Sequence, residues 1–136
     1  MKRRICALLA WGLLSLGAGV PAWAHHSFAA AYDTTLSSSV KGVIFQVRLE
    51  NPHSWFFLDV KDANGKVERW AFEAGTPSGM IRNGFKPSEI KAGSEMTIKY
   101  FHARDTSAKA GMLSQLTTAD GKVYGMFGPQ QGPGAQ

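Results

Sequence analysis

The chain has 136 residues, 44% of them hydrophobic, which is enough for one domain with a single core. Its formal net charge is +5, but without the basic residues at positions 2–4 twelve basic residues face ten acidic ones, a net charge of +2. Nucleic-acid binding normally needs a clustered basic face, so this balance argues against a nucleic-acid partner. The single cysteine, Cys6, excludes an internal disulfide, and stability must therefore come from packing.

Residues 1–24 have the three-part pattern of a secretory signal peptide. Three basic residues precede an apolar run at 5–20, and Ala22 and Ala24 are the small residues that a signal peptidase reads. The apolar run is shorter than the roughly 20 residues that a helix needs to span a bilayer. We therefore expect cleavage after Ala24, a periplasmic or secreted protein, and no membrane span after processing. An uncleaved N-terminal anchor is the alternative.

Alternating hydrophobic residues predict two strands in the first half of the chain, at 41–49 and 54–61. We expect the first strand to carry Val43, Phe45, Val47 and Leu49 on one face. The second strand has one face formed by Phe56, Leu58 and Val60. Its opposite face carries Trp55, Phe57 and Asp59.

A hairpin and a second group of strands follow. Asn64-Gly65 is a strong turn signal, because a type I′ turn needs positive φ angles, and it predicts a return strand at 67–74. The next segment is rich in Gly and Pro and has room for one short helix near 77–83. Two further strands are predicted at 95–104 and 111–119.

The order of these elements predicts a mainly β fold, a five-stranded OB-like Greek-key barrel with one short helix between strands 3 and 4. A different small β-barrel or a sandwich is the alternative, because strand order in the sequence does not determine topology. A turn at Asp120-Gly121 leads into a possible short closing strand at 122–127. We expect the domain to cover residues 25–127 and a disordered tail to cover 128–136, which contains only Gly, Pro, Gln and Ala.

Several motifs resemble a family of small exported bacterial proteins of unknown function. They are "HHSF" at 25–28, the pair Tyr32-Asp33, "NPH" at 51–53 and "WAFEAGTP" at 70–77. The resemblance spans nearly the whole chain after residue 24. It implies an exported OB-like domain and implies no activity.

The four histidines are the candidate metal ligands. After cleavage His25 would carry a free amine beside its imidazole, and these two groups chelate one metal ion. A second imidazole would complete a set of three nitrogens, which favours Cu(II) among the divalent metals. The second imidazole is either His53 or His102. His26 is not expected to share a metal with its neighbour, because successive side chains of an extended segment point to opposite sides.

His53 and His102 can each be explained by a structural role instead of metal binding. His53 follows Pro52, which stiffens the loop before the second strand and suits a plain connection as well as a ligand. His102 is in phase with the predicted fourth strand and equally suits a hydrogen-bonded residue at a strand end. Glu73 is the carboxylate that we expect either to orient a histidine from behind or to cap the short helix.

Trp55 and Phe57 form a candidate surface for a ligand or partner, because OB-folds bind oligonucleotides and oligosaccharides on such a face. The alternative is that the N-terminal segment covers them, with Phe28 and Tyr32 on a short helix capped by Ser27. The sequence contains no hydrolase motif and no phosphate-binding loop.

Two functions follow as hypotheses. The first is an exported, non-enzymatic binding module that holds copper through His25 and a second histidine. The second is a metal-free adaptor that binds an envelope protein or a small ligand through the Trp55/Phe57 face. A copper redox enzyme is a weaker third, because it would need an open coordination position and a surface for a substrate.

Overall fold

The computed structural model describes residues 28–125. The predicted signal peptide, His25, His26, Ser27 and the predicted tail lie outside this range. No helix in the described part of the chain is long and apolar enough to cross a membrane.

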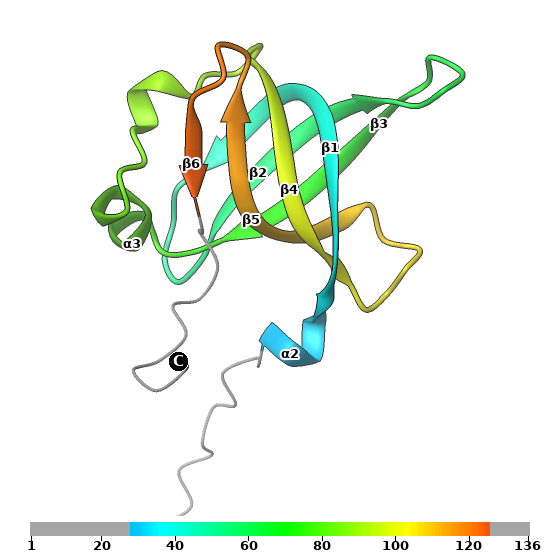
Figure 1. Cartoon of the computed structure of the whole chain (residues 1–136), viewed down its shortest axis with the longest axis horizontal. Coiled ribbons are helices and arrows are strands. Elements are labelled where there is room, and N and C mark those ends of the chain that lie inside the picture. Colours follow the sequence, from blue (N-terminus) through cyan, green and yellow to red (C-terminus); the bar gives the residue numbers. More distant parts are fainter. Residues whose placement is uncertain (1–27, 126–136) are drawn as a thin grey trace, which may run out of the picture.

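Five strands close into a barrel (Figure 1). They are β1 (Tyr32–Arg48), β2 (Ser54–Lys61), β3 (Val67–Ala74), β4 (Glu95–Ala103) and β5 (Ala110–Thr118). The order around the sheet is β3-β2-β1-β4-β5 with antiparallel neighbours, and a parallel pairing of β3 with β5 closes it. A short sixth strand, β6 (Val123–Gly125), adds to β5. The predicted OB-like barrel is confirmed.

The predicted helix between the third and fourth strands is α3 (Pro77–Arg82). Thr76 caps it, because its hydroxyl accepts a hydrogen bond of 3.1 Å from the backbone N–H of Gly79. Met80 from this helix is buried in the core. A 3₁₀ turn, η2 (Pro87–Glu89), then leads the chain into β4.

The core lies inside the barrel and is built from alternate residues of its strands. Phe56 and Leu58 on β2 are fully buried, as the sequence pattern predicts. Aromatic rings meet edge-on in the core, as Phe56 does with Phe85 at 5.8 Å between centroids. Gly111 on β5 has no room for a side chain, because an added Cβ would lie 2.4 Å from the ring of Tyr100.

The prediction for the first strand was wrong in its length and in its faces. The strand begins at Tyr32, nine residues earlier than expected. Val43 and Phe45 are 42% and 47% exposed, whereas Ile44 is buried. The register with β2 shifts between Ile44 and Gln46, and after this bulge Val47 packs against the core. A bulge adds one residue to one strand and so moves the following side chains to the other face.

The chain before β1 forms the short helix α2 (Phe28–Ala31). We call residues 28–33 the N-terminal arm. Figure 1 shows α2 at the lower end of the barrel, where β1 begins. Arg104, just after β4, holds the arm with two hydrogen bonds, from its backbone N–H to the carbonyl of Ala31 (2.9 Å) and from its Nε to that of Ala29 (2.7 Å). The arm is thereby tied to the end of β4.

Candidate functional site

Four side chains from separate parts of the chain meet at one site, which we call the His53 cluster. It consists of Phe28, Tyr32, His53 and Glu73. The arm contributes the first two, the loop before β2 contributes the third, and β3 contributes the fourth. The neighbours of Glu73 along β3 are buried in the core, so its side chain points to the outside of the barrel.

Glu73 connects the tyrosine to the histidine. Its Oε2 accepts a hydrogen bond from the hydroxyl of Tyr32, and its Oε1 lies against Nδ1 of His53. Burial raises the pKa of the Tyr32 hydroxyl, and the hydrogen bond to Glu73 and its charge raise this pKa further. Tyr32 therefore remains a donor. Because a carboxylate only accepts, Nδ1 of His53 carries a proton, and in the neutral imidazole Nε2 has the lone pair.

The imidazole of His53 is covered on one face. The ring of Phe28 stacks on it with 4.9 Å between centroids and 18° between planes. The His53 side chain is 32% exposed, whereas that of Glu73 is 13% exposed. The cluster thus has a shielded carboxylate behind a histidine that reaches solvent.

The other described histidine, His102, has different neighbours. It lies on β4 opposite Asp33. Its Nε2 is 2.8 Å from the hydroxyl oxygen of Ser38, and its ring is 5.1 Å from that of Tyr100. The structure therefore places Glu73 against His53, and not against His102, a choice that the sequence left open.

Within residues 28–125 no three His, Cys, Asp or Glu side chains are grouped to hold a metal ion. His53 brings one imidazole with Glu73 behind it. A metal bound there needs further ligands, and the residues from which the sequence analysis expects them, His25 and its amine, lie outside the described range.

The outward side of β2 carries the predicted aromatic face. Trp55 and Phe57 are partly exposed and lie side by side, with 6.4 Å between ring centroids and 20° between planes. Trp55 is the cross-strand neighbour of Glu73, so this face begins directly beside the His53 cluster. The ring contacts of Phe28 within the described residues are with His53 and Tyr32.

A third aromatic residue belongs to this outer surface, and the sequence pattern missed it. Phe45 is exposed on β1, and the guanidinium of Arg69 lies 3.3 Å from the centre of its ring. Arg69 also makes two hydrogen bonds to the carboxylate of Asp59, of 2.8 and 3.1 Å. Phe45 points outward because it follows the buried Ile44, and nothing in the local sequence marks the bulge that then returns Val47 to the core.

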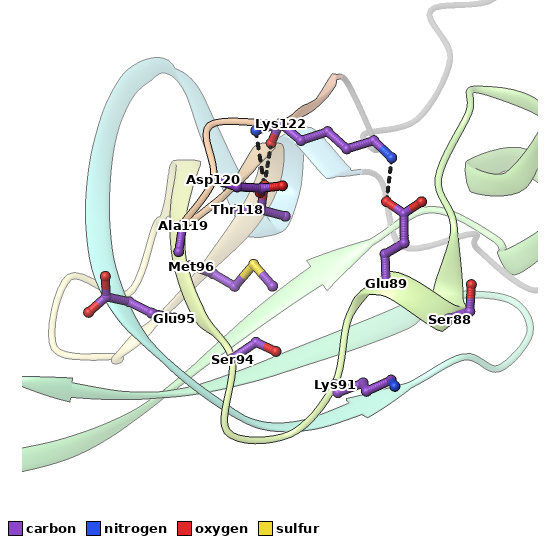
Figure 2. Close-up of a pocket in the computed structure, with 10 residues that line it drawn as sticks. All are labelled: Ser88, Glu89, Lys91, Ser94, Glu95, Met96, Thr118, Ala119, Asp120 and Lys122. Atoms are coloured by element: carbon purple, nitrogen blue, oxygen red, sulfur yellow. Dashed lines mark hydrogen bonds and ion pairs between the residues drawn. The ribbon is translucent and has the colours of Figure 1, made fainter.

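A cleft of about 670 Å³ lies at another part of the barrel, between the segment that enters β4 and the turn from β5 to β6 (Figure 2). Glu89 and Lys122 line this cleft, and together with Tyr124 they form what we call the Glu89 cluster. Lys122 and Tyr124 both donate hydrogen bonds to Oε2 of Glu89. These hydrogen bonds lower the pKa of Glu89 to about 2, and the one from Lys122 has the larger effect. Figure 2 shows Lys122 reaching across the cleft to Glu89. The sequence analysis did not predict this cluster.

Comparison with known proteins places the chain in a family. The model of a family of unknown function, DUF6152, matches residues 13–113. The chain belongs to this family. The segment that matches the DUF6152 model contains all four histidines and Glu73, and it ends within β5. No match was found among curated proteins or among solved structures.

Proposed function

We propose that the protein is an exported binding module that holds a copper ion through His25 and His53. The observation that supports this proposal is the stacking of Phe28 on His53. His25 precedes Phe28 by three residues, and three residues of chain reach at most about 10 Å. The folded arm thus brings the start of the processed chain within reach of one particular imidazole.

The chemistry of the three nitrogens suits Cu(II). Signal cleavage after Ala24 would leave His25 with a free amine, whose ordinary pKa near 8 lets a metal displace its proton. The amine and the His25 imidazole would chelate the ion, and Nε2 of His53 would supply the third nitrogen. Glu73 would orient His53 from behind, as carboxylates do for many metal-bound histidines.

The first test is a Cu(II) titration of the protein that begins at His25, with the EPR spectrum and competition binding constants as readouts. The matched control is the same protein acetylated at the amine of His25, which converts the amine into an amide and adds no new terminal amine. We expect nitrogen hyperfine structure in the processed protein and binding at least 100-fold weaker in the control. Equal binding by both proteins would refute a site made by cleavage.

A pair of variants tests which imidazole takes part. We expect His53→Ala to lose the high-affinity site and His102→Ala to keep it, because Glu73 orients His53 alone. If His102→Ala lost the site and His53→Ala kept it, His102 would be the ligand and the arrangement proposed here would be wrong.

The competing function is a metal-free adaptor that binds an envelope protein or a small ligand through the Trp55/Phe57 face. It is supported by the outward, side-by-side rings of these two residues. Copper binding by the processed protein, measured with and without Trp55→Ala, separates the two proposals. Under the copper proposal this variant keeps copper affinity, whereas under the adaptor proposal the processed protein shows no high-affinity copper site at all.

A further inference from the structure

We infer that Tyr32 is a positioning residue that, through Glu73, makes Nε2 the copper-binding nitrogen of His53. This inference rests on the proposed site at His25 and His53 and adds a role for the arm. Tyr32 touches neither the proposed ion nor its ligands. It acts on the carboxylate behind one of them.

The argument begins with the two oxygens of Glu73. Each oxygen has one partner, Tyr32 on Oε2 and His53 on Oε1. Two donors on opposite oxygens hold the carboxylate in one orientation, and the hydroxyl of Tyr32 is the partner buried deeper in the protein. Without that hydroxyl, Glu73 would be held only by the histidine that it has to orient.

The second step concerns the nitrogens of His53. Nδ1 is occupied by Glu73, and Phe28 lies flat on the ring. Tilting the imidazole would break the stacking, and a 180° flip would break the contact with Glu73. This leaves Nε2 as the nitrogen that can bind a ligand. In His102, by contrast, Nε2 is the nitrogen that already has a hydrogen-bond partner, the hydroxyl of Ser38.

The third step concerns the chain that carries these groups. Tyr32 and Phe28 both lie on the arm, and two residues separate the arm from His25 in the sequence. Arg104 fastens the arm to the barrel through the carbonyls of Ala29 and Ala31. The arm would therefore carry the groups that orient His53, and the residues just before the arm would supply the other copper ligand. Docking of the arm and formation of the site would be a single event.

The test uses the imidazole nitrogen chemical shifts of His53, measured by ¹⁵N NMR on the processed, metal-free protein. We expect the tautomer with the proton on Nδ1. Tyr32→Phe should mix the two tautomers and weaken Cu(II) binding by less than the roughly 10-fold loss expected on removing Glu73, the group directly behind the ligand. Tyr124→Phe is the matched control, because it removes a tyrosine that donates to the other carboxylate, Glu89. We expect it to change neither readout.

Each outcome decides the inference. If wild-type His53 carries its proton on Nε2, or if Tyr32→Phe changes neither the tautomer nor the affinity, the inference is wrong. Should Tyr32→Phe not fold, the wild-type spectrum decides alone: a slowly exchanging Tyr32 hydroxyl proton together with the Nδ1–H tautomer supports the inference, and absence of either refutes it. The tautomer is measured without metal, so an absence of copper binding would refute the proposed function separately.

Discussion

The His53 cluster and the Glu89 cluster have the same plan and different partners. In each, one carboxylate accepts a hydrogen bond from a tyrosine hydroxyl and also contacts a basic nitrogen. The carboxylate of the His53 cluster is 13% exposed, whereas that of the Glu89 cluster is 36% exposed. The basic nitrogen belongs to a histidine in the first cluster and to Lys122 in the second.

This difference makes the His53 cluster a candidate binding site and the Glu89 cluster a structural contact between two segments. A lysine ammonium has three donors and no lone pair, so Lys122 has nothing to offer a metal ion. An imidazole held at Nδ1 still has a lone pair at Nε2, so His53 can bind one. The Glu89 cluster instead connects η2 to the last strand, because Glu89 lies on the first and Tyr124 on the second.

Removal of the two carboxylates should produce the largest contrast in stability. We expect Glu73→Ala to lower the free energy of unfolding by about 1–3 kcal/mol, because it leaves the buried Tyr32 hydroxyl without its acceptor. Glu89→Ala should cost less, since water can replace the carboxylate at an exposed site. Urea unfolding monitored by circular dichroism measures both. Equal losses would mean that burial does not distinguish the clusters.

Removal of the two basic side chains should separate stability from binding. We expect His53→Ala to destabilise the protein less than Glu73→Ala, because the histidine is 32% exposed, yet to abolish high-affinity copper binding. Lys122→Ala should leave copper binding unchanged. Urea unfolding and Cu(II) competition on the same three proteins test this. Copper loss in the lysine variant would contradict the division of roles.

Acid should affect the Glu89 cluster in a defined window. The pKa of Glu89 falls from 4.5 to about 2 on folding, so the unfolded chain binds the proton first. The resulting stabilisation is present above about pH 4.5 and is lost as the pH falls towards 2. We expect Glu89→Gln to remove this part of the pH dependence. The check is the urea midpoint between pH 2 and 6 for both proteins. An unchanged profile in the variant would show that other carboxylates cause the acid sensitivity.

The barrel was predictable because its signals are local. Strand β2 alternates strictly, the turn after it carries Asn64-Gly65, and Thr76-Pro77 begins the one helix between the third and fourth strands. Each of these features depends on neighbours within a few residues. The same reasoning was wrong for Val43 and Phe45, because an interruption in pairing with another strand reverses the faces without any local mark.

Local patterns were enough to predict the order of the strands along the chain, the position of the helix and a short list of chemically useful side chains, which already contained His53 and Glu73. Which of these side chains meet depends on how distant segments pack together. Glu73 lies 20 residues from His53 and 41 from Tyr32. The first contact exists because β2 pairs with β3, and the second because the arm lies against the barrel. Local patterns report burial along one strand. They do not report which loop or arm lies over it, since that depends on contacts between segments far apart in the chain.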